Sequence, residues 1–418
     1  MLMSTALVLF MVPGLALFYG GMVRAKNVGN MLMMNMACVA IVPILWILFT
    51  YSLGNSPNVN ASGDTDKSGL FGGDLIGNFE VAGLSGIAGT DLVGVAFFMT
   101  FAAITPALIS GAVADRMRFG AWVAFVTLWS VLVYTPVTYW VYTGWHTELN
   151  PHALDFAGGT AIHINAGVAA LVMALVLGKR RGLGEEDMSP HNLSLLLIGT
   201  GVLWFGWFGF NAGSAGAADG IAAQALINTF IAGAAGMVGW VGTEWLRDGK
   251  ATVLGTASGL VAGLVAITPA AGFVTSTSSI LFGLVSGLVC YFAVQLKDSL
   301  GYDDSLDVVG IHGVGGIVGG LLLGLLSSLK VNNAGANGGV DLLVSQAIAM
   351  GSVIIFSGVM TYLIAKFLDA TIGLRVSDEE EFTGLDVSIH GQTVYASDNS
   401  SGQAAVQATW ARTAAPWA

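Results

Sequence analysis

Charge is scarce in this sequence. Of its 418 residues, 10% are charged and 55% are hydrophobic, whereas soluble domains carry about 25% charged residues. Such a chain could not cover a soluble surface, which excludes a soluble enzyme and a disordered protein. The 15 Lys and Arg residues are outnumbered by 26 Asp and Glu residues, so no basic patch for nucleic acid is expected. The composition leaves a polytopic membrane protein.

Cysteine is scarce as well. Cys38 and Cys290 are the two cysteines, and both lie in apolar blocks, which argues against a disulfide framework. The apolar residues form long blocks without the period-2 alternation of a membrane barrel, so the spans are expected to be helices. The first block begins beside Met1 without a basic segment before it, and we interpret it as a span and not as a cleaved signal peptide.

Long hydrophobic runs are what the sequence does contain. A helical span needs about 20 mostly apolar residues, and eleven blocks meet this requirement. We therefore predict an all-α integral membrane fold with eleven transmembrane helices. An odd number places the N-terminus and the C-terminus on opposite sides of the membrane. The expected spans are 2–23, 28–53, 91–114, 119–142, 157–177, 193–214, 221–246, 251–269, 279–296, 306–327 and 343–368.

The basic residues indicate the orientation. With the N-terminus outside and the C-terminus inside, only Lys67 and Lys330 lie on the outer side. The other Lys and Arg residues then lie on the inner side, as the positive-inside rule requires. They are Arg24, Lys26, Arg116, Arg118, Lys179, Arg180, Arg181, Arg247, Lys250, Lys297, Lys366, Arg375 and Arg412.

Two longer polar stretches interrupt this pattern. Residues 54–90 form an outer loop rich in Gly, Asn and Asp. Residues 1–369 are expected to form the transmembrane domain and residues 370–418 a cytoplasmic C-terminal tail. The tail begins with the acidic run 378–381, and its Ala-, Gln- and Ser-rich end, 397–418, is expected to be disordered.

Two of the six histidines fall inside expected spans, and their surroundings match. His163 and His312 each follow an Ile, precede a run of small residues, and lie eight residues after an aspartate, Asp155 or Asp304. The motifs are 149 residues apart, which corresponds to five spans. Spans 1–5 and 6–10 are therefore predicted to form an inverted repeat, an arrangement that places functional sites near the midplane between its halves.

Each of these residues has a structural and a functional interpretation. A lone histidine in a span can be a core residue, but a pair at equivalent positions favours function, because two neutral imidazoles can satisfy each other and pass a proton. Close helix packing alone explains the small residues. Each aspartate can cap a helix, which is worth about 1 kcal/mol. Asp155, on the outer side, can also attract cations.

The transported species is constrained by what the spans lack. No Asp, Glu, Lys or Arg lies near the middle of any span. A metal ion would need carboxylate or thiolate ligands beside the imidazoles, and any full charge would face a barrier on the order of tens of kcal/mol before compensation. A species that sheds its charge and crosses as a small neutral molecule fits better.

Six stretches resemble, in order, the signatures of the ammonium transporter family (Amt, Mep and Rh proteins), in particular its prokaryotic Amt type. The resemblance covers about residues 4 to 396 and implies a homotrimer in the cell membrane, with one pore through each protomer. The stretches are PGLALFYGGMVRAKN at 13–27, FAAITPALISGAVADRMRF at 101–119, DFAGGTAIHINAG at 155–167, WFGFNAGSAG at 207–216, DDSLDVVGIHGVGG at 303–316 and GLDVSIHGQTVY at 384–395.

The resemblance also implies roles for single residues. His163 and His312 correspond to the twin histidines of the pore, which would relay protons. Phe101 and Phe210 correspond to a phenylalanine gate below an outer vestibule. The apolar pore wall would include Leu108, Val141 and Val308, with Leu15 and Phe18 toward the exit.

The vestibule departs from the family pattern at one position. Ser214, Asp155 and Phe101 would contribute to ammonium binding there, together with a Trp that the family places in the fourth span. In this sequence the corresponding position is Tyr142, which still offers a cation–π face. Trp145 is the alternative if the register is shifted. The tail also departs, because it has HGQ where the family often has HGE.

The predicted function is ammonium transport. The outer vestibule would capture NH₄⁺, with methylammonium as a further substrate, and the pore would conduct NH₃ with the proton following along the histidines. Two alternatives are an ammonium sensor that transports little and a channel for another neutral solute, which would need no vestibule aromatics. We expect no cofactor, no metal and no enzymatic activity. Membrane lipid and a PII-type regulatory protein docking at the tail are the expected partners.

Overall fold

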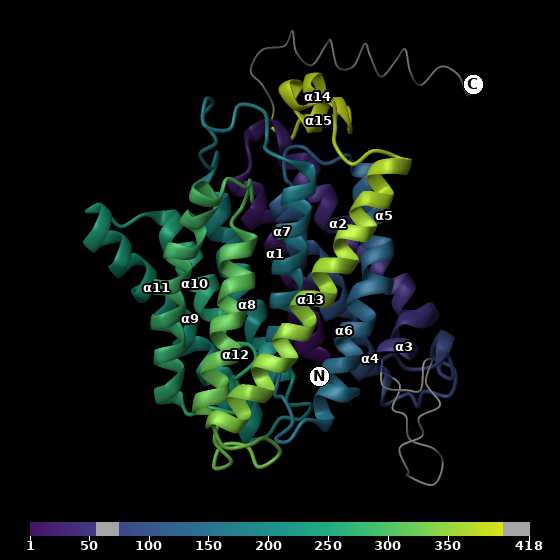
Figure 1. Ribbon diagram of the computed structural model, residues 1–418, viewed down its shortest axis with the longest axis vertical. Coiled ribbons are helices and arrows are strands. Elements are labelled where there is room, and N and C mark those ends of the chain that lie inside the picture. The colour runs from purple at the N-terminus through teal and green to yellow at the C-terminus, as the bar shows by residue number, and fades with distance from the viewer. Residues whose placement is uncertain (56–74, 396–418) are drawn as a thin grey trace.

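The computed structural model describes residues 1–55 and 75–395, and within these ranges the chain is helical, with two isolated β-bridges as its only extended pairs. The helices pack into one bundle, with the N-terminus and the tail helices α14 and α15 toward opposite ends (Figure 1). The predicted disorder of 397–418 concerns residues outside the described ranges. The helices are α1 Leu2–Met22, α2 Val28–Leu45, α3 Tyr51–Asn55, α4 Leu92–Ile109, α5 Phe119–Trp129, α6 Thr135–Tyr142, α7 Asn165–Leu177, α8 Leu193–Gly213, α9 Gly220–Asp248, α10 Val253–Ile267, α11 Ser276–Leu300, α12 Gly315–Leu326, α13 Val340–Thr371, α14 Asp378–Thr383 and α15 Leu385–Ser388.

Helices long enough to cross a membrane lie where the sequence predicts spans. Among the described residues, ten helical segments are long and apolar enough, and the shorter α10 has 15 residues. Two predicted spans consist of two labelled helices joined by a π-helical turn, Trp46–Thr50 between α2 and α3 and Ser130–Tyr134 between α5 and α6. The predicted all-helical, multi-pass fold is confirmed.

Helix α13 is longer than its predicted span. It has 32 residues, against the 26 of the expected span 343–368, and it crosses the bundle at a slant (Figure 1). A tilted helix needs more residues than an upright one to cross the same hydrocarbon thickness. Hydropathy alone does not report tilt, which is why the sequence underestimated this helix.

Helices α1 and α8 pack closely, and they begin the two predicted repeats. Gly199 of α8 lies against α1, where an added Cβ would be 2.3 Å from the backbone nitrogen of Phe18. Only glycine permits this approach, as is common where membrane helices pack without a hydrophobic driving force. The contact places side chains of both halves around one central space.

A buried ion-pair network ties together the loops at the end of the bundle that carries the tail. Arg180 donates to both carboxylate oxygens of Asp303 at 2.9 Å, and Arg116 donates to the backbone carbonyl of Asp303 at 2.6 Å. Arg24 donates to Asp115 at 2.9 Å, and Arg180 lies 3.8 Å from the same carboxylate. Burial alone would raise the pKa of Asp303, but the hydrogen bonds from Arg180 and the charge of Arg116 hold this pKa below its usual value.

The first part of the tail is folded against these loops. The backbone N–H of Val376 donates to the carbonyl of Arg116 at 3.0 Å. Further along, the carboxylate of Asp386 accepts from the backbone N–H groups of Gly29 and Asn30 at 2.9 and 2.8 Å. These bonds use the N–H groups at the start of α2, which a helix leaves without partners of its own. The tail is thereby joined to the start of α2 and to the loop that follows α4.

Replacing Asp303 tests the network. Asp303→Asn would remove the counter-charge of buried Arg116 and the nearer of the two counter-charges of Arg180, at a cost of about 3–5 kcal/mol, so we expect a clearly lower unfolding temperature in detergent. Because the pKa of Asp303 is lowered, its contribution to stability is present above the ordinary Asp pKa and is lost as the pH falls through the folded-state value. The exposed Asp298 provides the matched control, Asp298→Asn, with an effect within about 0.5 kcal/mol. Equal stability of the two variants would contradict this role.

Candidate functional site

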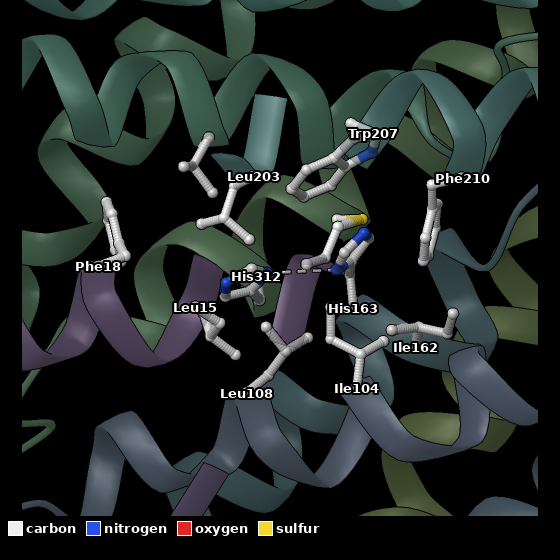
Figure 2. A pocket seen from close by; sticks show the side chains of 12 residues that line it. Leu15, Phe18, Ile104, Leu108, Ile162, His163, Leu203, Trp207, Phe210 and His312 are labelled. Atoms are coloured by element: carbon white, nitrogen blue, oxygen red, sulfur yellow. Dashed lines mark hydrogen bonds between the residues drawn. The ribbon is translucent and has the colours of Figure 1, made fainter. Parts of the chain in front are cut away.

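A narrow apolar cavity lies at the centre of the bundle (Figure 2). Only about 10 Å³ is open to the centre of a water-sized sphere, which is room for about one small molecule. Its wall comes from α1, α4, α8, α10 and the two segments that carry His163 and His312. The cavity thus lies between the two halves of the predicted repeat.

The two histidines contact each other across this cavity. Their Nδ1 atoms are 3.2 Å apart, and the residues are only 2% and 4% exposed. One Nδ1 must carry a hydrogen and the other must accept it. The Nε2 atom of His163 is buried and has no hydrogen-bond partner among the described residues. Because an unpaired buried polar atom costs about 1–3 kcal/mol, this nitrogen is suited to bind a polar molecule in the cavity.

Each histidine belongs to a π-helical turn, η8 Gly159–Ile164 or η9 Val309–Val314, that continues into α7 or α12. The two segments approach each other where Gly167 of α7 meets Gly313 of η9, and a Cβ on Gly167 would lie 2.3 Å from the Cα of Gly313. Any side chain at Gly167 would therefore push the two segments apart. The small residues after each histidine serve helix packing, as expected.

Aspartates close the N-terminal ends of these turns. Asp155 accepts four hydrogen bonds of 2.6–3.1 Å from the consecutive backbone N–H groups of residues 158–161. Asp304 accepts one of 2.7 Å from Val309. Such bonds satisfy N–H groups that the start of a helix leaves free, so both aspartates have the capping geometry.

A stacked pair of phenylalanines lies at one end of the cavity, where Phe210 is part of the wall. The rings of Phe101 and Phe210 are 4.3 Å apart and nearly parallel, and each residue is 1% exposed. Phe210 lies on the side of His163, and Phe18 lies on the side of His312 (Figure 2). The cavity therefore runs from the stacked rings past both histidines toward Phe18.

Trp207 is a site residue that the sequence analysis missed. Its ring stacks on His163 at 5.5 Å, and its Nε1–H donates to the hydroxyl of Thr268 at 2.9 Å. The hydrogen bond fixes the indole, and the indole in turn holds the imidazole. The spacing offered a signal, because Trp207 precedes Phe210 by three residues and therefore shares its helix face.

Tyr142 lies near the phenylalanine pair. Its ring is 6.2 Å from Phe98, which is 5.8 Å from Phe101, and its buried hydroxyl has no hydrogen-bond partner in the part of the chain that the structure describes. Trp145, the alternative vestibule residue, packs against Trp140 and borders a different groove, on α13. The geometry therefore favours Tyr142 over Trp145 as the aromatic side chain next to the gate.

The two polar residues expected in the vestibule differ in how many further hydrogen bonds they can make. The hydroxyl of Ser214 donates to the carbonyl of Phe210 at 2.9 Å, which leaves its oxygen free to accept a bond from ammonium. Asp155 uses its carboxylate oxygens for the backbone bonds of its loop. Its contribution to cation binding could then only be through its charge.

Three of the five predicted wall residues line the cavity, namely Leu15, Phe18 and Leu108. Val141 and Val308 are buried but are not part of this wall, so their role remains a prediction. The wall residues that the sequence analysis did not single out, besides Trp207, are Met11, Ile104, Ile162, Leu203 and Val261.

A model of the Ammonium Transporter Family matches residues 1–395. The chain belongs to the ammonium transporter family. An ammonium transporter of Mycobacterium bovis is 48% identical over 425 residues, which cover 94% of this chain and 89% of that protein. An ammonium transporter of Bacillus subtilis is 46% identical over 410 residues, which cover 94% of this chain and 97% of that protein. Both similarities confirm the resemblance seen in the six motifs.

Solved structures of the ammonium transporter family share the fold. The crystal structure of Candida albicans Mep2 has a TM-score of 0.80 at 33% identity, covering 90% of this chain and 85% of that one. A structure named Sensor Amt Protein has a TM-score of 0.81 at 26% identity, and the match covers 93% of this chain and 96% of that one. The protein is therefore a multi-pass protein of the cell membrane, and its family supports ammonium transport.

Substitution of Tyr142 tests the vestibule. Cation–π binding contributes about 0.5–2 kcal/mol, so Tyr142→Leu should raise the ammonium concentration for half-maximal transport about 2- to 30-fold, whereas Tyr142→Trp should keep or lower it. Uptake into proteoliposomes over a range of ammonium concentrations measures the effect. Trp145→Leu is the control and should change nothing. If the effects of the two Leu variants were reversed, Trp145 would be the capturing residue.

Proposed function

We propose that this protein captures NH₄⁺ at an outer vestibule, deprotonates it, and conducts NH₃ through the histidine cavity. The observation that carries the proposal is the imidazole pair, bonded Nδ1 to Nδ1 at 3.2 Å in an otherwise apolar cavity with two stacked phenylalanines at one end. Hydrocarbon walls favour a neutral species. The His163 Nε2 atom, which has no partner among the described residues, offers ammonia a hydrogen bond within the cavity.

Deprotonation lowers the barrier in this proposal. An ammonium ion in a lumen without carboxylates would lose most of its hydration, at a cost on the order of tens of kcal/mol before compensation. Ammonia, being neutral, loses far less hydration free energy, and it regains hydrogen bonds at the imidazoles. The proton follows along His163 and His312, whose shared hydrogen bond can be reversed by exchanging donor and acceptor. Transport is then electrogenic, although proton and ammonia cross separately.

The assembly proposed for this protein is a homotrimer surrounded by lipid, with the N-terminus outside. Helices α9 and α11 support it, because they expose many large apolar side chains. Such a surface must be covered by lipid or by a neighbouring protomer. The exposed residues on these two helices include Leu226, Phe230, Val238, Leu246, Leu284, Leu288 and Phe292.

The inner tail is proposed as a docking platform for a PII-type regulatory protein. Support comes from its ordered contacts with the basic loops. Glu381 accepts from the backbone N–H of Arg181 at 2.6 Å and pairs with Arg375 at 2.8 Å, while Phe382 lies under the Arg181 guanidinium at 4.8 Å. Phe382 is 62% exposed, so the tail adds an apolar side chain to a charged surface.

The histidines provide the main test. His163→Ala or His312→Ala removes one partner of the buried pair and interrupts the relay, so the current that an ammonium pulse drives on a supported membrane should disappear in each variant. His152→Ala in the outer loop is the matched control and should keep the current. Unchanged current in both pore variants would refute the mechanism. A wild-type protein that binds ammonium without current or uptake would instead indicate a sensor.

Removal of the tail tests its proposed role. Truncation after Ala370 eliminates the contacts of residues 375–386 with the inner loops, and we expect lower transport and no binding of a PII protein from the same organism, with assembly retained. Co-purification and size-exclusion chromatography measure binding and assembly. Full transport together with undiminished PII binding would reject the platform.

A further inference from the structure

The residue before each capping aspartate is held by a buried side chain. Leu154 and Asp303 are these residues, and each lies nine residues before its histidine. The backbone carbonyl of Asp303 accepts a hydrogen bond from the guanidinium of Arg116 at 2.6 Å. The backbone carbonyl of Leu154 accepts one from the side-chain amide of Gln346 at 2.9 Å. Arg116 and Gln346 are 0% and 1% exposed, so a buried donor holds the corresponding carbonyl in both motifs.

The two donors come from different parts of the chain. Arg116 lies on the loop that follows α4 and belongs to the ion-pair network around Asp303. Gln346 lies on α13, which follows both motifs in the sequence. A buried guanidinium needs a counter-charge, whereas a neutral amide needs only hydrogen-bond partners. The motif of His163 is therefore held by α13 without an ion pair at this point.

Gln346 binds both polar groups of the Leu154 backbone. Its Oε1 accepts from the N–H group at 2.6 Å, and its Nε2 donates to the carbonyl at 2.9 Å. An amide carries its donor and its acceptor side by side in one plane. The two bonds therefore determine the orientation of the Leu154 backbone as well as its position. A side chain with only one of these functions could not form both bonds.

The backbone of Leu154 leads directly to the turn that carries His163. Asp155 is the next residue, and its carboxylate accepts hydrogen bonds from the N–H groups of residues 158–161. These groups begin the π-helical turn in which His163 lies. A displacement of the Leu154 backbone would move this carboxylate, and the turn would move with it.

Helix α13 also holds the chain at other points near His163. The hydroxyl of Ser357 donates to the backbone carbonyl of Asn165 at 3.2 Å, two residues after the histidine. The hydroxyl of Ser352 lies 2.9 Å from Nε2 of His146, in the loop that precedes the motif. The histidine segment is thus bonded to α13 both before and after His163.

We propose that Gln346 is a positioning residue for His163, which keeps this imidazole in register with His312 through Leu154 and Asp155. The inference rests on the proposed function, because the register matters for transport only if the histidine pair conducts. Gln346 does not line the histidine cavity, so it acts through the backbone and not on the transported molecule. The Nδ1 atoms are already 3.2 Å apart, and a small displacement is enough to break their hydrogen bond.

Gln346→Met tests this role, because Met keeps the approximate volume of the side chain and removes both hydrogen bonds. In proteoliposomes, the maximal ammonium-driven current per folded transporter should fall about tenfold or more, since a displacement of about 1 Å can disable a reaction that depends on geometry. The ammonium concentration for half-maximal current should stay unchanged, because Tyr142 is not altered. A raised half-maximal concentration at unchanged maximal current would overturn the proposal.

Gln224→Met is the matched control. Gln224 lies on α9, and its side-chain amide also donates hydrogen bonds, to Asn228 and Ser276. Loss of these bonds can lower the unfolding temperature, but the current per folded transporter should remain that of the wild type. Equal currents in the two Met variants would show that Gln346 has no specific role and would overturn the proposal.

Gln346→Glu offers a rescue that depends on hydrogen bonding. A neutral carboxyl can accept from the Leu154 N–H group and donate to its carbonyl, as the amide does, whereas an ionised carboxylate can only accept. The current of this variant, divided by the wild-type current at the same pH, should be near that of wild type while the carboxyl is neutral and should fall as it ionises at higher pH. A ratio as low as that of Gln346→Met at every pH would overturn the proposal.

A measurement without current separates this inference from the proposed function. With ¹⁵N-labelled histidine in lipid bilayers, solid-state NMR detects the coupling between two ring nitrogens that share a hydrogen. Wild type and Gln224→Met should show this coupling, and Gln346→Met should lose it. Coupling that persists in Gln346→Met, or that is missing in wild type, would overturn the positioning role. A wild type with the coupling but without current would overturn the electrogenic mechanism and leave the positioning of His163 intact.

Discussion

The structure depends on one constraint, which is that two polar rings must remain satisfied inside an apolar cavity. An imidazole in hydrocarbon is costly unless its nitrogens have partners. The bond between His163 and His312 satisfies one nitrogen of each ring within the protein. It does so only while both rings are held in register, and much of the bundle around them can be understood as the means of holding them.

The two matching Asp and His motifs supply this register. Each histidine lies in a π-helical turn, and an aspartate accepts hydrogen bonds from free N–H groups of that turn. The backbone of each turn is therefore fixed independently of the cavity. The glycine contact at Gly167 then sets the separation of the two turns. Trp207 fixes the plane of one ring through its own bond to Thr268. The pair is thus positioned by backbone contacts and packing, and needs no charged group within the membrane.

Much of this was visible in the sequence, and the reason is physical. Membrane spans must be long and apolar, so their positions follow from hydropathy, and a repeated Asp and His at equal spacing predicts that two matching segments meet at one site. Side-chain direction is harder to predict. Val141 lies directly between two residues of an aromatic motif, yet it does not line the central cavity, whereas Trp207 does. The helix tilt that lengthens α13 and the unequal bonding of Asp155 and Asp304 arise only from tertiary packing, which no local pattern reports.

The two halves of the repeat share their motifs but face different surroundings, and this difference can give the pore two chemically distinct ends. A symmetric pore would have the same proton affinity at both mouths. Here Phe210, stacked on Phe101, lies on the side of His163, and Phe18 lies on the side of His312. A separate cavity is bordered by Lys297, Asp303 and Asp307. None of these residues belongs to the repeated Asp and His pattern. Asp304, which does belong to it, is their neighbour in the sequence. The repeated motifs therefore build the site, and residues that are not duplicated give its two ends different surroundings.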